Sequence, residues 1–250
     1  MNSALRVIDL SLDIGGAKIL DGITLSVLNN ETLGIIGPNG AGKTSLFNLL
    51  SAIRKPTRGQ IFIGENDVTD MAPHERANAG IARTFQTSSV FVNLTCLENV
   101  RIAAQASNGK SMNLSKNAYK FTEVVAQAHD CLEKVGLSSY AMQRAGALSH
   151  GDKRRLEIAI VLASNSQIVL LDEPMAGMSV EVVPELVEII RSLATVHKKT
   201  VLIVEHHMEV ILGLADRIAV LNYGELLVCD TPANVINNPI VQSAYIGEAL

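Results

Sequence analysis

The sequence has no tryptophan and few aromatic residues of any kind, which make up 4% of its 250 positions. It also has only three cysteines, Cys96, Cys131 and Cys229, which lie far apart and lack the spacing of metal ligands. The small, odd number of cysteines and their spacing argue against a disulfide framework and a metal site, and they fit reduced thiols in a cytosolic protein. With 48% hydrophobic residues, the chain is still long enough to bury a sizeable core.

Long hydrophobic runs are also missing, since no stretch reaches the roughly 18 apolar residues that a membrane-spanning helix needs. Residues 1–10 lack the charged start and apolar middle of a signal peptide. Charged residues make up only 18%, and the net charge of −4 argues against nucleic acid as the main partner. We therefore expect a chain that is soluble by its own sequence and reaches a membrane only through a partner protein.

Short β-type runs alternate with helical patterns over most of the chain. Turn signals stand at Asp21–Gly22, Asn29–Asn30 and Tyr223–Gly224. Buried apolar strands that alternate with helices predict an α/β fold with a mainly parallel core sheet. The predicted strands cover residues 4–12, 23–29, 32–37, 59–67, 167–173 and 199–205, with a hairpin over residues 216–230.

Helical periodicity is clearest after the first of the short buried strands. In residues 43–53, four aliphatic side chains recur at helical spacing on one face: Leu46, Leu49, Leu50 and Ile53. Residues 91–164 form a helical insertion with a polar surface loop at 107–117. A further helix is predicted over residues 180–196, and Thr231 and Pro232 suit the N-cap and first position of another.

One glycine-rich stretch, "GIIGPNGAGKTS", has the G-x-x-x-x-G-K-[ST] spacing of a phosphate-binding loop between a strand and a helix. Glycines let backbone N–H groups close around phosphate oxygens, and the positive end of the helix points at them. Lys43 is expected to reach the β- and γ-phosphates, and Thr44 to offer its hydroxyl to Mg²⁺. The predicted nucleotide-binding residues here are Gly37, Pro38, Asn39, Gly40, Ala41, Gly42, Lys43, Thr44 and Ser45.

Two acids, Asp172 and Glu173, follow the buried apolar run of residues 168–171. In open α/β sheets, ligands bind at the edge where the carboxyl ends of the strands lie. One acid can hold magnesium through water while its neighbour polarises the attacking water. We assign Asp172 to the metal and Glu173 to the general base.

A basic helix start lies at residues 149–155. Ser149 and Asp152 have the spacing of a capping box, yet Lys153, Arg154 and Arg155 oppose the positive end of the helix dipole. Either these cations point to solvent, or something negative lies in front of the helix.

Five motifs in order, "GPNGAGKTS", "RTFQ", "LSHGD", "LLDEP" and "VEHHM", make the chain similar along its whole length to the ATPase subunit of ABC transporters. Within this family, the motif sequences most resemble those of the branched-chain amino acid importer type, in "GIARTFQ", "LSHGDKRRLEIAIVLAS", "LLDEPMAGMS" and "NPIVQSAYIGE". The resemblance implies the P-loop NTPase fold of an ABC ATPase, with a mainly parallel core sheet, an antiparallel β part and an inserted helical subdomain. It implies one domain over residues 1–250: a core lobe at 1–86 and 165–232, a helical subdomain at 87–164 and a helical tail at 233–250.

The resemblance also implies roles for residues outside the loop. Gln86 would complete the magnesium shell and sense the permease, and His206 would contact the γ-phosphate. Ser149 and Gly151 would close on ATP held by a second subunit. That ATP would then be the negative group in front of the basic helix start. The implied cofactors are ATP and Mg²⁺, with Lys43, Gln86, Glu173 and His206 as the catalytic set and Thr44, Gln86 and Asp172 as the metal-binding set.

The chain departs from the family pattern at several positions. Ile14 stands where relatives usually place an aromatic ring on adenine, so we expect weaker discrimination of that base. In the signature motif "LSHGD", His150 and Asp152 stand where relatives usually have a glycine and a glutamine. Residues 175–179 lack an aspartate that many relatives have there. Importer subunits of this type tolerate similar motif sequences, so these changes do not imply an inactive site.

The resemblance implies a peripheral ATPase subunit on the cytoplasmic face of the cell (inner) membrane. Its expected partners are transmembrane permease subunits, a second ATPase subunit (a sister chain or the chain itself) and an extracytoplasmic substrate-binding protein. Residues 87–100 are the expected docking surface, unless their apolar side chains are ordinary core. Branched-chain amino acids are the leading cargo, with urea or short amides as the alternative.

Non-transport relatives of this ATPase core fit the sequence less well. DNA-repair and chromosome relatives carry long coiled coils between the phosphate-binding loop and the motif that corresponds to "LSHGD". In this chain the same interval, residues 45–148, shows no sustained heptads. Translation-associated relatives carry two cassettes in one chain. A regulatory module that holds ATP without hydrolysing it would not need Lys43, Asp172, Glu173 and His206 together.

Overall fold

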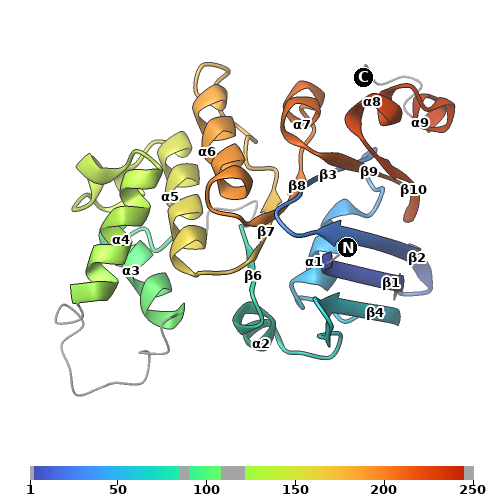
Figure 1. Cartoon of the computed structure of the whole chain (residues 1–250), viewed down its shortest axis with the longest axis horizontal. Helices are drawn as coiled ribbons and strands as arrows, with labels where there is room; N and C mark the ends of the chain where they lie inside the picture. The colour runs from blue at the N-terminus through green and yellow to red at the C-terminus, as the bar shows by residue number, and fades with distance from the viewer. Residues whose placement is uncertain (1–2, 85–89, 108–121, 245–250) are drawn as a thin grey trace. The chain divides into compact units, whose positions relative to one another are not determined.

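The computed structural model describes residues 3–84, 90–107 and 122–244, and these fall into two compact units (Figure 1). The first unit consists of Met1–Arg83, Gln167–Glu173 and Arg191–Leu250. The second consists of Thr84–Ser166 and Pro174–Ile190. The sequence-based division kept 174–190 with the core lobe, whereas the structure groups this segment with the helical unit.

A six-stranded sheet forms the centre of the first unit. Its strands follow the order β10-β9-β3-β8-β7-β6 and are parallel except for the antiparallel pair of β10 and β9. Every residue of β3, β7 and β8 is buried, as expected for apolar strands in the middle of a parallel sheet. The predicted mainly parallel core sheet is confirmed. The strands are β3 (Thr32–Ile36), β6 (Ile81–Arg83), β7 (Ile168–Asp172), β8 (Thr200–Val204), β9 (Arg217–Asn222) and β10 (Glu225–Asp230).

A four-stranded antiparallel sheet completes the β-structure of this unit, in the order β2-β1-β4-β5. It contains β1 (Ser3–Ile14), β2 (Ala17–Leu28), β4 (Arg58–Ile63) and β5 (Asn66–Asp67). The inward faces of β1, β2 and β4 bury aliphatic side chains such as Leu10, Leu20 and Ile61 in the main hydrophobic core.

The turn predicted at Asp21–Gly22 is wrong. Both residues lie inside β2, and the chain reverses instead at Gly15–Gly16, which have φ angles of 57° and 84°. Asp21 and Gly22 together oppose Ser11 of β1, because Leu10 pairs with Ile23 and Leu12 with Leu20. An extra residue in one strand is a β-bulge, which uses the same residue types as a turn.

The helix after β3, α1 (Lys43–Leu50), buries Leu46, Leu49 and Leu50 as predicted. Ile53 does not join them: α1 ends at Leu50, and the Ile53 side chain is exposed. The unit also contains α2 (Pro73–Asn78), α7 (Met208–Leu214), α8 (Pro232–Ile236) and α9 (Pro239–Ala244). Thr231 and Pro232 occupy the N-cap and first position of α8, as the sequence predicts.

The second unit is built from three helices that pack on one another: α3 (Cys96–Ser107), α4 (Thr122–Lys134) and α5 (His150–Ala163). Short 3₁₀ turns, η2 (Ser138–Tyr140) and η3 (Ala145–Ala147), lie between α4 and α5. The next helix, α6 (Val183–Thr195), begins in this unit. Within the described ranges, no helix is long and apolar enough to cross a membrane.

Candidate functional site at the carboxyl edge of the six-stranded sheet

The predicted phosphate-binding loop connects β3 to α1 in the first unit. A side chain at Gly37 would place its Cβ 2.2 Å from the carbonyl oxygen of Leu221 in β9. Gly42 has φ 101° and lies against Leu20 of β2, where a Cβ would approach the leucine to 2.6 Å. Both glycines are therefore required by close packing against other strands, and the loop is fixed from two sides.

Lys43 closes this loop from within. Its side-chain Nζ donates hydrogen bonds to the carbonyl oxygens of Gly37, at 2.5 Å, and Pro38, at 3.1 Å. The residue is only 7% exposed, so its charge is held at the centre of the loop. In the structure, Lys43 thus binds carbonyl oxygens of its own loop. It is predicted to bind the phosphates of a nucleotide held by the same loop.

A hollow of about 310 Å³ opens beside the loop. Glu173, at the end of β7, and His206, just after β8, both line it. Because β7 and β8 are adjacent parallel strands, their carboxyl ends bring these two side chains to the same edge. The other lining residues are Ile19 and residues 39–45, so seven of the predicted nucleotide-binding residues share one hollow with two predicted catalytic residues.

Glu173 and His206 contact each other directly. A glutamate oxygen, Oε1, lies 3.0 Å from the ring Nε2 of His206. The Glu173 backbone has φ 47°, a left-handed conformation that is uncommon for a residue with a long side chain. Its N–H donates to the Val204 carbonyl oxygen at 2.9 Å, which holds this turn against β8. The sequence predicted each residue separately, and the structure pairs them.

Asp172, the predicted metal-binding acid, is 1% exposed. Its Oδ2 accepts a hydrogen bond from the Arg83 guanidinium at 2.8 Å. Thr44, the second predicted metal ligand, lines the hollow beside the loop. A hydroxyl and a carboxylate are the hard oxygen donors that Mg²⁺ prefers, so the described donors fit this ion.

Gln86, the third predicted metal ligand, lies outside the described residues, as do 87–89 of the predicted docking segment. Within the described ranges, no three His, Cys, Asp or Glu side chains gather as they would at a zinc site.

The structure places Ile19, and not the predicted Ile14, in the lining of the hollow beside the loop. Ile14 ends β1 and is partly exposed, but it does not line the hollow beside the loop. Ile19, two residues into β2 after Ala17, lines it. Sequence reasoning missed Ile19 because nothing but its place in the strand register distinguishes it from other aliphatic residues of β2.

The signature residues belong to the second unit. Ser149 is the N-cap of α5, and its hydroxyl accepts from the Asp152 N–H at 3.1 Å, which confirms the predicted cap. Gly151 lies close to Val182, where a Cβ would come within 3.1 Å of the valine Cγ1. Gly151 thus allows the first turn of α5 to pack tightly within its own unit.

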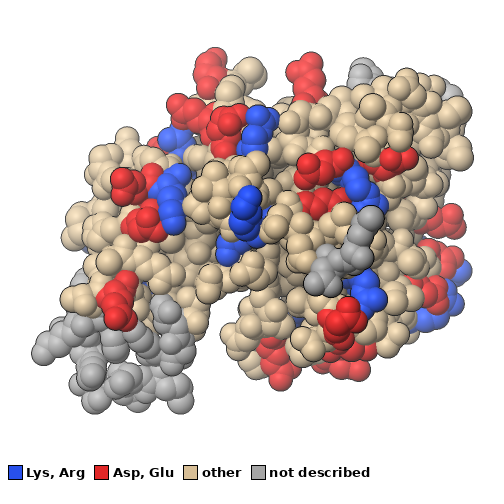
Figure 2. Space-filling model, viewed as in Figure 1, with Lys and Arg blue, Asp and Glu red and all other residues tan. Residues whose placement is uncertain are grey.

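The basic residues of α5 have acidic partners. Arg154 is 4% exposed and pairs with Glu157 at 2.8 Å, and Arg155 pairs with Glu185. The idea that these arginines point to solvent is therefore wrong. Their charge is balanced inside the second unit, so the electrostatic problem posed by the sequence is answered locally for two of the three cations. On the face in Figure 2, acidic and basic side chains are likewise interspersed.

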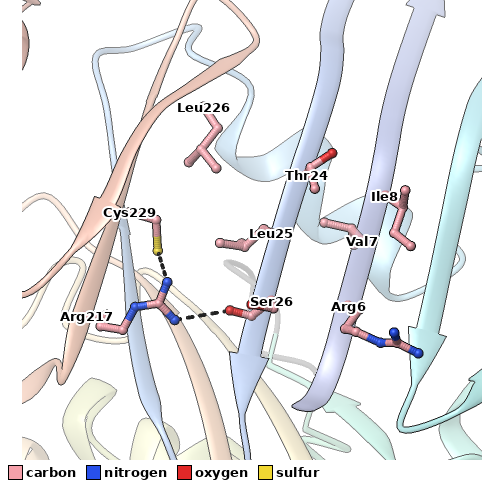
Figure 3. A pocket seen from close by; sticks show the side chains of 9 residues that line it. All are labelled: Arg6, Val7, Ile8, Thr24, Leu25, Ser26, Arg217, Leu226 and Cys229. Atoms are coloured by element: carbon pink, nitrogen blue, oxygen red, sulfur yellow. Dashed lines mark hydrogen bonds between the residues drawn. The ribbon is translucent and has the colours of Figure 1, made fainter. Parts of the chain in front are cut away.

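A second hollow, of about 240 Å³, lies where β1 and β2 meet β9 and β10 (Figure 3). None of the predicted nucleotide-binding residues lines it. At its wall, Arg217 donates to the Cys229 sulfur at 3.0 Å and to the Ser26 carbonyl oxygen at 3.2 Å. Burial nevertheless raises the pKa of the Cys229 thiol to about 11, against the opposing effect of the arginine. The protonated thiol makes this hollow a poor place for nucleophilic chemistry.

Residues 20–176 match the family described as ABC transporter. The chain belongs to this family. It is 38% identical over 250 residues to the high-affinity branched-chain amino acid transport ATP-binding protein LivG of Salmonella typhimurium, and the match covers 98% of each chain. The predicted family resemblance is therefore confirmed.

Solved ATP-binding cassettes have the same fold. The ADP conformation of MJ1267, an ATP-binding cassette of an ABC transporter, matches with a TM-score of 0.87 and 32% identity over 99% of this chain and 100% of that one. A dimeric post-hydrolysis state of the cassette MJ0796, bound to ADP and Pi, matches with a TM-score of 0.77 and 25% identity over 91% of this chain and 98% of that one. The chain is thus an ATP-binding cassette of an ATP-hydrolysing family, as predicted.

Proposed function

We propose that the chain hydrolyses ATP to power an importer of branched-chain amino acids, as a peripheral subunit on the cytoplasmic face of the inner membrane. The likeness to LivG along almost the whole of both chains carries the choice of cargo. The contact between Glu173 and His206 beside the phosphate loop supports hydrolysis over mere nucleotide storage. Urea and short amides are the competing cargoes, and transport assays separate them from amino acids.

In this proposal the triphosphate lies in the hollow beside the loop, with its β- and γ-phosphates against the backbone N–H groups of residues 39–45. Lys43 exchanges its two carbonyl contacts for phosphate oxygens, which are stronger acceptors because they are charged. Thr44 and Asp172 hold magnesium together with Gln86. Bound there, the ion neutralises charge on the phosphates.

Glu173 acts as the general base toward the attacking water. Its side chain is mostly buried at 18% exposure, and it faces the open hollow from the end of β7. His206 is within hydrogen-bond distance and orients the carboxylate until the γ-phosphate arrives. The strained backbone of Glu173 is consistent with a residue that is held in place for its chemistry.

A second ATPase subunit completes each nucleotide site, through Ser149 and Gly151 of its signature segment. The dimeric MJ0796 cassette supports such an arrangement. The remaining partners are a transmembrane permease and an extracytoplasmic substrate-binding protein. Phe91 and Val92 are both more than half exposed, which favours them as permease contacts, whereas Cys96, Leu97 and Val100 from the same predicted segment are buried.

Co-purification from native membranes tests the transport assignment. The tagged chain, extracted in mild detergent, is expected to bring multi-span permease chains and either itself or a sister ATPase. The recovered complex, reconstituted into vesicles with its binding protein, should import labelled leucine in an ATP-dependent way and should not import urea. Recovery with ribosomes or DNA, or urea uptake in place of leucine uptake, would contradict the proposal.

The shared-site arrangement has its own test in Ser149→Arg. A bulky cation at this position is expected to abolish turnover while ATP affinity of the isolated chain stays within about twofold. Ser149→Ala is the milder variant: it removes the helix cap, worth about 1 kcal/mol of stability, together with the hydroxyl that would reach the partner's nucleotide, so turnover should fall less than in Ser149→Arg. Loss of ATP binding by the isolated Ser149→Arg chain would show that the residue acts within its own subunit.

A further inference from the structure

Arg83, the last residue of β6, makes three side-chain hydrogen bonds, although the sequence motifs leave it without a role. One guanidinium nitrogen, Nη2, donates to Asp172 Oδ2 at 2.8 Å. The other, Nη1, donates to Asn48 Oδ1 at 2.8 Å and to Ser51 Oγ at 2.9 Å. The guanidinium carbon lies 5.6 Å from the centroid of the Phe47 ring.

These contacts join two elements that carry predicted metal ligands. Phe47 and Asn48 lie in α1, and Ser51 caps its C-terminus. Asn48 is four residues after Thr44, one helical turn farther along the same face. Asp172 ends β7, the strand that pairs with β6. The guanidinium therefore connects the helix that bears Thr44 to the carboxylate of Asp172.

The burial of this ion pair indicates that it does more than add stability. The side chains of Arg83 and Asp172 are 6% and 2% exposed. Removing two charges from water costs several kcal/mol per ion, and replacing such a pair by apolar residues is often neutral or stabilising. What the pair provides is geometry, since a planar guanidinium fixes both the direction and the distance of each partner.

We propose that Arg83 is a positioning residue for magnesium: it holds the Asp172 carboxylate at a fixed place relative to Thr44, so that the two oxygen donors meet the ion together. The inference rests on the proposed function, because it takes Thr44 and Asp172 as the metal-binding pair. It adds a residue that contacts neither the ion nor the nucleotide. The consequence is that Arg83 governs the magnesium-dependent part of nucleotide affinity and leaves the magnesium-independent part unchanged.

The chain offers a matched control in Arg6. Its guanidinium carbon lies 5.1 Å from the Phe62 ring centroid, and it pairs with Glu65 at 3.2 Å. It thus combines an aromatic ring and a carboxylate as Arg83 does, but in the four-stranded sheet. In Figure 3 its side chain points away from Arg217, and it does not line the hollow beside the phosphate loop.

The test measures binding of a fluorescent ATP analogue to the full chain, first in EDTA and then over a magnesium titration. Wild type, Arg83→Lys, Arg83→Met and Arg6→Met are compared, with a thermal unfolding midpoint for each. In EDTA all four should bind within about twofold of one another. The magnesium concentration for half of the affinity gain should rise at least tenfold in Arg83→Met, less in Arg83→Lys, and not at all in Arg6→Met.

A second variant guards against a fold that fails without the buried cation. Asn48→Ala combined with Ser51→Ala removes both hydrogen bonds from Arg83 to α1 and keeps the ion pair with Asp172. It should raise the magnesium midpoint about threefold to fivefold and leave binding in EDTA unchanged. If this variant and Arg83→Lys both kept the wild-type midpoint, the inference would be overturned.

The outcomes separate the inference from the proposed function. If wild type itself gained no affinity from magnesium, the proposed metal site would fail, and the inference would fail with it. If wild type gained affinity and Arg83→Met kept the same magnesium midpoint, the proposed site would stand and the positioning role would be overturned. If Arg83→Met unfolded at a lower temperature but kept the wild-type magnesium midpoint, Arg83 would serve stability alone.

Discussion

Two arginines of the first unit lie over phenylalanine rings and pair with carboxylates, yet their surroundings differ. Arg83 and Asp172 have side chains 6% and 2% exposed, whereas Arg6 and Glu65 are 35% and 89% exposed. The exposed pair is worth between about 0 and 1 kcal/mol, because water competes for both charges. The buried pair can persist only where several contacts fix it.

This difference shows where the chain concentrates its chemistry. The four-stranded sheet keeps its charges at the surface, as in Lys18–Asp21 and Arg58–Asp9. At the carboxyl edge of the six-stranded sheet the charges are buried: Asp172 ends β7, Glu205 follows β8 and Lys43 begins α1 after the phosphate loop, and each is less than 10% exposed. A buried charge interacts more strongly with its neighbours, so Lys43 can attract an anionic group at this end and the two carboxylates can attract a cation.

The largest expected effect comes from Glu173→Gln, at the buried end. Removal of the general base should reduce steady phosphate release from Mg-ATP by about 1,000-fold, within the range typical of lost acid–base catalysis. ATP affinity should stay close to wild type, since the amide keeps the size of the carboxylate. Glu65→Gln, at the exposed end, is the matched control and should hydrolyse ATP normally. Equal activity in the two variants would remove the basis of the comparison.

Arg76 tests whether a buried cation that hydrogen-bonds backbone carbonyl oxygens is equally important. It is 1% exposed, burial lowers its pKa, and its guanidinium donates to the carbonyl oxygens of Leu49, Leu50, Val68 and Thr69. Arg76→Met leaves these carbonyls without that donor and should reduce the free energy of unfolding by about 3 kcal/mol. Arg58→Met, at an exposed pair, should change it by less than about 0.5 kcal/mol in the same denaturant titration.

The reactivity of the Cys229 thiol tests the border of the two sheets, where burial raises the pKa of the thiol and Arg217 lowers it. Its pKa of about 11 lies above the ordinary value of 9.0, so the folded chain holds the protonated form between these pH values. In a Cys96→Ala, Cys131→Ala background, alkylation at pH 8 should be about 100-fold slower in the folded than in the denatured chain.

The alkylation rate of the folded chain should then rise about tenfold per pH unit until it levels near pH 11, as the thiolate fraction grows. The same shift removes stability as the pH rises from about 9 through 11, because the unfolded thiol loses its proton first. A rate that levelled near pH 9 would show that Arg217 cancels the effect of burial.

The smallest expected effect is in base selectivity. In the proposed site, the aliphatic Ile19 lines the hollow that would hold the nucleotide, and Ile14 stands where relatives usually have an aromatic ring. Without a stacked ring, the affinities for ATP and GTP should agree within about fivefold in competition binding. Ile14→Tyr should increase affinity for ATP, since base stacking is worth about 1–3 kcal/mol. A strong preference of the wild type for ATP would show that another group reads the base.

Local patterns predicted the fold and the site best. The loop at 37–45, the acids after β7 and the cap at Ser149 depend on residues that are neighbours in the chain, and the sequence shows them directly. Asp21–Gly22 was taken for a turn because a bulge and a turn use the same residues. The prediction that Ile53 lies on the buried face of this helix failed because α1 ends at Leu50, three residues earlier, a boundary that hydrophobic spacing does not fix.

Contacts between distant residues were beyond the reach of the sequence. Arg155 meets Glu185, 30 positions away, and Arg83 meets Asp172, 89 positions away. Neither pair follows a periodic pattern, since each forms only when separate elements pack together. Arg83 left one usable signal, a cation at the end of a short strand that leads toward Gln86.

The strand order has a consequence for synthesis on the ribosome. β3, which leads into the phosphate loop, lies between β8 and β9, which follow it by more than 160 residues in the chain. A nascent chain that has exposed only the loop motif therefore lacks both neighbours of that strand, as well as the Leu221 carbonyl that packs against Gly37. Nucleotide cannot assist the early stages of folding, and retention on ATP-agarose should appear in stalled chains only once residues beyond about 222 have left the exit tunnel.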